Sequence, residues 1–582
     1  MTHRLVIKPH VAMAIIAVLG LYGCLGGDLL GADSKRLSAL SDQSRPLNAD
    51  NYSDHLSARY ASLVEDESAA AHFYSSALGR QPESLDLLER AVAYELAALR
   101  PEKAVELALE APRETSENAP LIRLLLTAKA FAEEKPDQAL QILKDNQKTP
   151  FDPGLDKHLT IWATIDNHSS QTDFNAPVKD GLGYFLLGLE LVARGEDEIA
   201  LKAFEEGWKN GARFAHGADT YIRLVASNGD HQKARELVEE YYISIGDNPL
   251  IDYLSGQIKA GEVIKLSRLN SRQGAATIYF AYASQHLARR QQEMATIYLV
   301  LARMADPENE PVAILLSDLL SSRGEFEKAN DILNEISDKS IYLAAAKARQ
   351  AAVFYDMQQD DLALKAARKA MDVGAGRSLQ MKVGEIYALL GRYEDAEITY
   401  TSVLDKDATR GIVDWRVLFA RAGVRDKQGN WAGAENDLME SLSLAPETPE
   451  LLNYLGYSWV DRGINVEAGF QMILQAVSKR PDAGYIRDSL GWAYYRLGHF
   501  EKAVEVLEEA AALDPADPTI NDHLGDAYWK IGQTRQAQFQ WGRVVEYSRD
   551  DALKAQSQVK LRDGLNAPDT LVEAYSTQSD FE

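Results

Sequence analysis

The sequence is poor in cysteine, since Cys24 is the only one among 582 residues. The chain therefore cannot form an internal disulfide, and a metal site built from several thiolates is excluded. Basic residues are also in the minority: 62 Lys and Arg stand against 87 Asp and Glu, a formal net charge of −25. Because an acidic surface repels phosphate backbones, we do not expect nucleic acid as a partner.

Short motifs that mark enzymes are missing as well. The sequence has no HExxH zinc motif, no GxxxxGK[ST] phosphate loop and no GxSxG nucleophile elbow. The pair Gly181 and Gly183 lacks the third glycine of a dinucleotide-binding fingerprint. The histidines are scattered, and neither His499 nor His523 has a second ligand near it in sequence. We therefore predict no catalytic residue, no metal site, no cofactor and no enzymatic activity.

What the sequence does contain is a repeated pattern of small and aromatic residues between Pro449 and Val545. Each copy has a Leu-Gly pair, an aromatic three positions later, a second glycine and then an alanine: Leu455, Gly456, Trp459, Gly463 and Ala468; Leu490, Gly491, Tyr494, Gly498 and Ala503; Leu524, Gly525, Tyr528, Gly532 and Ala537. The leucines of these pairs lie 35 and 34 residues apart. This is the period and signature of the tetratricopeptide repeat, TPR, a pair of helices joined by a turn.

Each part of this pattern has a physical role. The first glycine and the alanine are expected where the two helices cross closely, and the second glycine ends the first helix in a left-handed conformation. Pro481 and Pro515 close the second helix, because proline cannot donate the next helical hydrogen bond. One helix pair cannot bury its apolar face alone, so the pairs must stack. We therefore predict an all-α fold, an α-solenoid in which TPR helix-turn-helix repeats form a right-handed superhelix.

The alanine of the pattern can be followed back through the chain, which predicts about thirteen repeats. Its positions are Ala70, Ala104, Ala139, Ala200, Ala234, Ala295, Ala329, Ala363, Ala396 and Ala434, followed by Ala468, Ala503 and Ala537. They group into N-terminal TPR-like repeats at 51–146, TPR repeats at 180–246 and a C-terminal TPR array at 275–548. Turn-forming residues break the phase at 147–179 and 247–274, which we interpret as irregular joints or degenerate repeats. The remaining segments are predicted to be a capping helix at 549–565 and a disordered tail at 566–582.

The N-terminus has the pattern of a bacterial export signal. Arg4 and Lys8 precede an apolar run, Val11 to Tyr22, that is too short to span a bilayer comfortably. The run ends in Leu21-Tyr22-Gly23-Cys24, which resembles the lipobox where bacterial lipoproteins are cleaved and lipidated, although Tyr22 departs from the usual small or β-branched residue.

We predict from this pattern a lipoprotein signal peptide at 1–23, lipidation of Cys24 and a flexible tether at 24–50. The alternative is that Cys24 is an ordinary cysteine, either buried in the fold or without a role in lipidation. Leu25, rather than aspartate, follows the cysteine, which resembles lipoproteins delivered to the outer membrane. We expect an outer-membrane lipoprotein that faces the periplasm and touches the membrane only through its lipid anchor; the alternative is a soluble periplasmic protein.

The first helix of each TPR pair turns a fixed set of positions toward the concave face of the superhelix. In the last three repeats we predict that a protein-binding groove is lined there by exposed aromatics between short polar groups: Asn453, Tyr457, Asp488, Trp492, Tyr495, Arg496, Asp522, Asp526, Trp529 and Lys530. Aromatic and arginine side chains dominate binding hot spots, and Asn or Asp can bond a peptide backbone. The alternative is that Trp492 and Trp529 only pack against the neighbouring repeat. A clamp for a terminal carboxylate is disfavoured, because Asp488 and Asp522 stand where such a clamp needs Lys and Asn.

Three stretches near the C-terminus carry a closer resemblance: LLNYLGYSWVDRG, RDSLGWAYYRLGHFEKAVEVLEEAAALDP and DHLGDAYWKIGQ. They resemble a bacterial family of TPR outer-membrane lipoproteins that includes partners of periplasmic carboxyl-terminal processing proteases. About the last 170 residues share this resemblance, and the rest of the chain shares only the architecture. The resemblance implies a non-enzymatic scaffold or adaptor that holds a protease, or a peptidoglycan (cell-wall) hydrolase, near its substrate.

Two other functions remain open at this stage. The chain could be a TPR subunit of an envelope secretion or polysaccharide-export machine, which a neighbouring gene for an export system would indicate. It could also be an enzyme with an unrecognised site, although solenoids usually recruit activity rather than carry it.

Overall fold

The computed structural model describes residues 49–64, 66–112, 119–145, 154–165, 180–548 and 550–565. Within these residues it contains 29 helices and no strand, so the predicted all-α fold is confirmed. The helices up to residue 372 are α3 (Ala49–Leu63), α4 (Glu67–Arg80), α5 (Leu85–Ala97), α6 (Pro101–Glu110), α8 (Pro120–Ala132), α9 (Pro136–Asp145), α10 (Leu155–Ala163), α11 (Gly181–Arg194), α12 (Asp197–Lys209), α13 (Ala215–Ser227), α14 (His231–Ser244), α15 (Pro249–Lys259), α16 (Ser271–Ala288), α17 (Gln292–Ala305), α18 (Glu310–Ser322), α19 (Phe326–Asn334), α20 (Leu343–Asp356) and α21 (Asp360–Asp372). The later helices are α22 (Arg377–Leu389), α23 (Tyr393–Thr409), α24 (Trp415–Lys427), α25 (Trp431–Leu444), α26 (Pro449–Arg462), α27 (Val466–Lys479), α28 (Gly484–Arg496), α29 (Phe500–Leu513), α30 (Pro518–Lys530), α31 (Thr534–Tyr547) and α32 (Asp551–Asp563).

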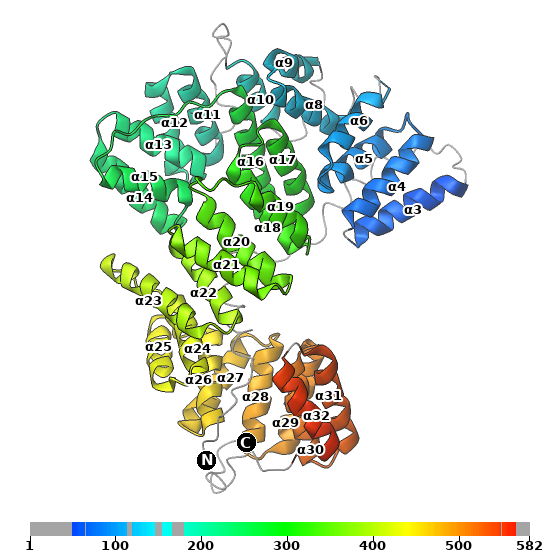
Figure 1. The fold of residues 1–582 in the computed structure, drawn as a ribbon, viewed down its shortest axis with the longest axis vertical. Helices are drawn as coiled ribbons and strands as arrows, with labels where there is room; N and C mark the ends of the chain where they lie inside the picture. Colours follow the sequence, from blue (N-terminus) through cyan, green and yellow to red (C-terminus); the bar gives the residue numbers. More distant parts are fainter. Residues whose placement is uncertain are drawn as a thin grey trace. The chain divides into compact units, whose positions relative to one another are not determined.

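The chain divides into two compact units, whose helices are labelled in Figure 1. One unit is Leu29–Leu379, which we call the N-terminal unit; the other contains Gln380–Glu582, which we call the C-terminal unit. The division falls inside α22, and therefore inside residues 275–548, which the repeat pattern alone suggested to be one continuous array.

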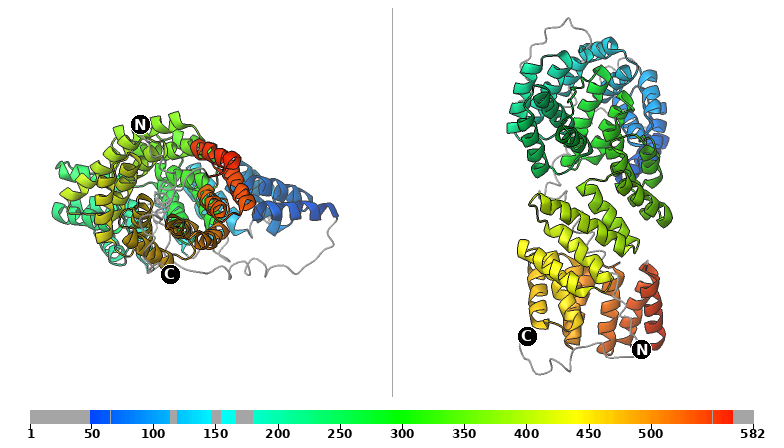
Figure 2. Two further views of the ribbon diagram at one scale, coloured as in Figure 1. Left: turned by 90° about the horizontal axis from the view of Figure 1, so that it is seen from below. Right: turned by 60° about the vertical axis from the view of Figure 1, so that its left-hand side comes forward.

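Helix pairs in the C-terminal unit are joined by short turns with the predicted glycine. Gly463, Gly498 and Gly532 follow the ends of α26, α28 and α30 with φ of +69°, +83° and +81°. This left-handed conformation suits glycine because it has no Cβ to clash with the backbone. The next helix of the pair then returns along the first, and α24 to α32 follow one another side by side (Figure 2).

The small residues of the pattern lie where the paired helices approach most closely. A Cβ added to Gly491 would lie 2.5 Å from Leu507 Cγ, and one added to Gly525 would lie 2.5 Å from Trp541 Nε1. All the alanines followed through the sequence are fully buried except Ala468, which is exposed. The stacked helix-turn-helix solenoid is therefore confirmed, and every alanine of the pattern but Ala468 lies at a buried position.

The exception at Ala468 corrects the predicted register of that repeat. Helix α27 begins three residues after Gly463, whereas α29 and α31 begin two residues after their glycines. The extra residue is Asn465, which has a left-handed φ of +47°. It shifts the register by one, so that Gly469 takes the contact position: a Cβ there would lie 2.7 Å from the carbonyl oxygen of Gly456. This insertion is the structural reason for the 35-residue spacing in the sequence.

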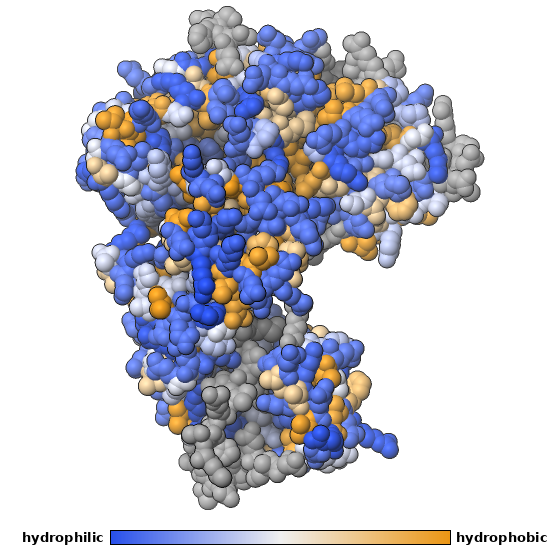
Figure 3. All heavy atoms as spheres, viewed as in Figure 1, coloured by the Kyte–Doolittle hydropathy of each residue, from blue (hydrophilic) through white to orange (hydrophobic). Residues whose placement is uncertain are grey.

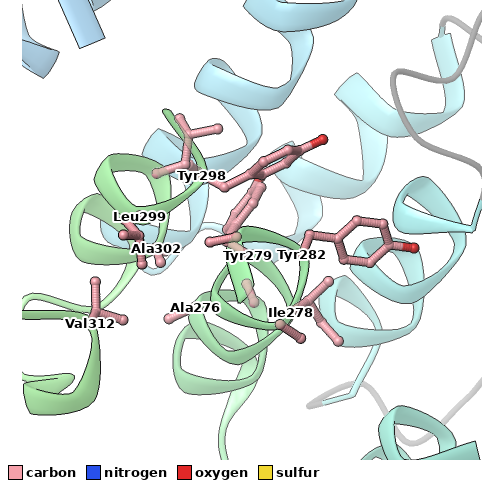
Figure 4. Packing of buried hydrophobic residues seen from close by; sticks show 14 of the residues in the cluster. Ala276, Ile278, Tyr279, Tyr282, Tyr298, Leu299, Ala302 and Val312 are labelled. Carbon is pink, nitrogen blue, oxygen red and sulfur yellow. The ribbon is translucent and has the colours of Figure 1, made fainter. Parts of the chain in front are cut away.

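The N-terminal unit departs from neighbour-only stacking. Helices α16 and α17 form a hairpin that also packs against α5, α6, α8, α10 and α11. Figure 4 shows the apolar core of this hairpin, in which Tyr279 and Tyr282 of α16 lie beside Tyr298 of α17. An ion pair 3.2 Å long joins Arg323 to Glu67, far apart in sequence. Long-range contacts of this kind make the N-terminal unit a compact body rather than a simple row of repeats.

The segments interpreted as irregular joints or degenerate repeats are partly helical, which favours the second interpretation. Residues 247–274 contain α15 and the start of α16, and only residues 260–270 between them lack a helix. Within 147–179, the described part forms α10, whose Leu159 and Trp162 are buried. Helix α10 contains no glycine, whereas α15 contains Gly256 and is followed by Gly261 with a left-handed φ of +69°, at a spacing that differs from the TPR pattern. Burial of an apolar stripe forms both helices without the full pattern.

The last described element is α32, inside the predicted capping segment 549–565. It buries Leu553 and Ser557 and leaves most of its other side chains at least partly exposed, which suits the end of a stack. The predicted signal peptide, Cys24, the tether up to residue 48 and the segment 566–582 lie outside the described residues. On the face drawn in Figure 3, hydrophilic residues predominate, as the composition leads one to expect.

Candidate protein-binding surface

The predicted groove residues lie on the first helices of the last three repeats, and these helices pack against one another in series: α26 against α28, and α28 against α30. The structure thus brings the predicted set onto one face, which we call the first-helix face of the C-terminal unit. The expected exposure is wrong for most of the set, however. Six residues are buried (Asn453, Asp488, Trp492, Tyr495, Asp522 and Asp526), and four are half-buried (Tyr457, Arg496, Trp529 and Lys530).

Trp492 shows why the exposure prediction fails. Its side chain is 2% exposed and that of Tyr495 is 1% exposed. The Trp492 ring stacks on Tyr495, with centroids 4.7 Å apart, and on the His523 ring of the next first helix, with centroids 4.0 Å apart. Its indole Nε1 donates to Asp461 Oδ1 at 3.0 Å. Trp492 therefore contacts three successive repeats. It packs against its neighbours, which is the alternative stated above, and does not line an open groove.

Polar contacts join each first helix of this unit to the next one. Arg462 of α26 binds Asp426 of α24, and Arg496 of α28 binds Asp461 of α26 at 2.9 Å. His523 Nδ1 of α30 lies 2.9 Å from the Asp488 carboxylate of α28. Lys560 Nζ of α32 lies 2.7 Å from Asp522 and 2.6 Å from Asp526, both of α30. We call this series the carboxylate ladder; each rung pairs a carboxylate with a basic side chain about one repeat later.

The ladder gives Asp488, Asp522 and Asp526 a structural role. Asp522 and Asp526 are buried and share Lys560 as a counter-charge, while Trp541 Nε1 also donates to Asp526 at 3.0 Å. Buried carboxylates require such partners because an isolated buried charge is costly. Lys560 was missed by sequence reasoning, since it lies in the cap outside the repeat pattern. Its distance of 34 residues from Asp526, one period, is the signal that could have found it.

What remains accessible on the first-helix face is a row of half-buried side chains. Tyr457 lies near the middle of α26, and Trp529 and Lys530 lie at the end of α30. Burial, with the nearby carboxylates of Asp461 and Asp488, raises the pKa of the Tyr457 hydroxyl, so it stays a neutral donor. Buried Asn453 has an Oδ1 atom with no hydrogen-bond partner, an acceptor that a donor from a ligand could satisfy.

A separate concavity lies on α23, with a volume of about 710 Å³. Its wall is one face of that helix, including Glu397 and the exposed Ile398, together with Arg425 of α24. Arg425 is 2.7 Å from Glu397 and 2.9 Å from Asp437, so its charge is already neutralised. The concavity is therefore a poor candidate for an anion site.

Within the described ranges, no group of three or more His, Cys, Asp or Glu side chains could hold a metal ion. None of the described helices combines the length and apolar character that a bilayer crossing requires.

A close pair, His158 Nδ1 and Glu190 Oε1 at 2.6 Å, is fully buried in the N-terminal unit. Burial there raises the pKa of the Glu190 carboxyl.

Comparison with known proteins agrees with the geometry of the last repeats. Residues 491–532, which run from α28 to just before α31, match the family model described as TPR repeat. This segment is similar to TPR repeats. A TPR repeat-containing protein of Pseudomonas aeruginosa is 28% identical over 163 residues. That match covers 26% of this chain and 27% of the relative's length.

Solved structures similar to this chain share little sequence identity with it. A crystal structure of the APC/C hetero-tetramer Cut9-Hcn1 has 15% identity and a TM-score of 0.37, covering 89% of this chain and 97% of that one. A thermophilic TPR protein of Thermus thermophilus has 21% identity and a TM-score of 0.29, covering 32% of this chain and all of that one. Both scores are low.

Proposed function

We propose that this protein is a non-enzymatic scaffold that binds other proteins through the first-helix face of its C-terminal unit. The observation that carries the proposal is the carboxylate ladder, which fixes α24, α26, α28, α30 and α32 to one another. A face held in this way is preorganised, so a partner does not have to order it on binding. The half-buried rings of Tyr457 and Trp529 would supply the anchors, and the Lys530 ammonium a polar contact.

We further propose where the scaffold acts and on what. A lipid on Cys24 would tether the chain to the outer membrane, with the repeats in the periplasm. The partner would be a carboxyl-terminal processing protease or a peptidoglycan hydrolase. The support is the lipobox-like sequence around Cys24 and the family resemblance of the last repeats. Tethering raises the effective concentration of the partner near its substrate without any new contact.

Capture of a purified carboxyl-terminal processing protease by the full chain tests the surface. Tyr457→Ala with Trp529→Ala should weaken capture by at least about thirtyfold, since truncating even one anchor of this kind costs about 2 kcal/mol. Tyr253→Ala, a half-exposed tyrosine of the N-terminal unit, is the matched control and should leave capture unchanged. Unchanged capture by the double variant, with helicity retained in circular dichroism, would place the binding surface elsewhere.

Metabolic labelling with a palmitate analogue tests the tether. The wild-type chain should be labelled and found in the outer-membrane fraction, and Cys24→Ser should lose both the label and the fractionation. A wild-type chain without label would refute the lipid anchor but leave the binding surface untouched.

A further inference from the structure

One face of α31 carries two arginines and two aromatic rings in a single row. Arg535, Phe539, Arg543 and Tyr547 are four residues apart, so each lies next to the following one on the helix surface. The row winds by about 40° per step and so covers about 120° of the helix from Arg535 to Tyr547. We call this row the α31 stripe. Phe539 is 63% exposed and Tyr547 is 44% exposed, although both are large aromatics. The Arg543 guanidinium lies 5.9 Å from the Phe539 ring centroid and 5.2 Å from that of Tyr547.

Among the described residues, no carboxylate pairs with the arginines of the stripe. Arg543 donates to the Asn521 side-chain oxygen at 3.0 Å and to the carbonyl of Pro515, and both acceptors are neutral. Arg535 is exposed and forms no ion pair with the described residues. The only acidic residue on α31, Glu546, pairs with neither arginine. Among the second helices of the C-terminal unit (α23, α25, α27, α29 and α31), α31 is the only one with a net positive charge.

The chain itself supplies a segment of complementary chemistry. Residues 566–582 contain no Lys or Arg and four acidic residues: Asp569, Glu573, Asp580 and Glu582. Between the acids stand apolar and aromatic residues: Leu571, Val572, Tyr575 and Phe581. Carboxylates suit the guanidinium groups of the stripe, and apolar side chains suit its exposed rings. We call this the 566–582 segment.

The segment starts close enough to reach the stripe. Helix α32 ends at Asp563, and a Cβ added to Gly564 would lie 2.1 Å from the Trp529 ring. Trp529 is near the end of α30, just before the turn that leads to Arg535. The stripe is about 18 Å long on a helix that rises about 1.5 Å per residue. Seventeen extended residues span about 56 Å, so the length of the segment is ample.

We propose that the 566–582 segment binds the α31 stripe of its own chain. Its carboxylates face Arg535 and Arg543, and its apolar residues cover Phe539 and Tyr547. Because the segment is attached, its effective concentration at the stripe is about millimolar, so even a weak contact is populated. The stripe is then a self-covered peptide-binding surface, distinct from the first-helix face, and an acidic peptide from another protein must displace the segment to bind there.

A labelled peptide with the sequence of residues 566–582 tests this on full chains by fluorescence anisotropy. In the wild type, the attached segment competes with the peptide. In the double variant Leu571→Ser with Tyr575→Ser, that competitor is weakened, and the peptide should bind at least tenfold more tightly than to the wild type. Adding Arg535→Glu and Phe539→Ser to this variant should abolish binding, whereas adding Arg368→Glu, an exposed arginine of α21, should not. Binding should also weaken with added salt, since exposed charges are screened.

Three outcomes would overturn the proposal. Failure of the Leu571→Ser with Tyr575→Ser chain to bind the peptide would show that the segment has no affinity for the stripe. Equal binding by the wild type and that variant would show that the segment does not cover the stripe in its own chain. Binding that survives Arg535→Glu with Phe539→Ser would place the peptide elsewhere. Circular dichroism of each variant must match the wild type, which is expected because the substituted residues of α31 are exposed.

Discussion

Replacing Lys560 by methionine should destabilise the end of the C-terminal unit strongly. Lys560 is 14% exposed at its side chain and is the shared counter-charge of Asp522 and Asp526, which are buried. Methionine keeps most of the volume but removes the ammonium, so two buried carboxylates are left facing each other. Breaking a buried ion pair by removing one partner costs about 3–5 kcal/mol.

The same structure predicts a rescue. Asp522→Asn with Asp526→Asn, added to Lys560→Met, removes the two buried negative charges. Asp522 now accepts a hydrogen bond from Ser557 Oγ, and Asp526 accepts one from Trp541 Nε1. Asparagine at either position keeps a side-chain oxygen that can still accept that bond. Most of the lost stability should return, because replacing a whole buried ionic network by neutral groups is often close to neutral.

Two measurements check this prediction. Thermal unfolding of Lys560→Met should shift down by about 6–20 °C, at about 2–4 °C per kcal/mol for a domain of this size. Hydrogen exchange should rise in α32 and α30 first, since the ladder ends there, and should fall again in the triple variant. The reasoning would be refuted if Lys560→Met melted like the wild type, or if the triple variant were no more stable than Lys560→Met.

Three further predictions concern the packing and the pH dependence. Gly491→Leu should cost more than about 1–3 kcal/mol in the free energy of unfolding, since its Cβ would already overlap Leu507, and an unchanged denaturant midpoint would contradict the helix crossing. Ala468→Leu should be tolerated while Ala503→Leu is not, because the first is exposed and the second fully buried; equal melting temperatures would undo the register correction. Burial raises the pKa of Glu385 from the usual 4.5 to about 7, so the folded state binds the carboxyl proton more tightly than the unfolded state does. The stability that the protonated carboxyl contributes is therefore fully present below pH 4.5 and is lost as the pH rises through 7. Glu385→Gln should therefore unfold like the wild type near pH 4 but be about 1–3 kcal/mol more stable at pH 8, and an identical gap at both pH values would rule this out.

Local signals in the sequence were enough to predict the repeat fold. The turn glycines Gly463, Gly498 and Gly532 have the left-handed backbone that their position after a helix requires, and Gly491 and Gly525 lie at close helix contacts. These features depend on a single helix pair, whose geometry follows from the residues within about 34 positions. A one-residue insertion was visible as a 35-residue spacing, but only the structure assigned it to the turn at Asn465.

Burial on the first-helix face was decided by tertiary structure. The side chains of Trp492 and Tyr495 lie on a helical face that borders both the groove and the next repeat. The helical period of apolar residues does not show whether such a side chain faces the groove or the next repeat. Stacking on His523, one repeat later, settles that they are core. Helices α10 and α15 likewise fall outside the pattern, because α10 has no glycine and Gly256 and Gly261 of α15 are not at the TPR spacing.

The sequence by itself determined the helix pairs, their turns and the chemistry that the chain lacks, because each of these depends on local residue types and spacing. Only the tertiary structure decided which polar groups are paired. Lys560 reaches Asp522 and Asp526 across a repeat boundary, and α16 and α17 pack against helices distant in the chain. Such contacts depend on how successive pairs rotate against each other, which the residues of a single helix pair do not determine.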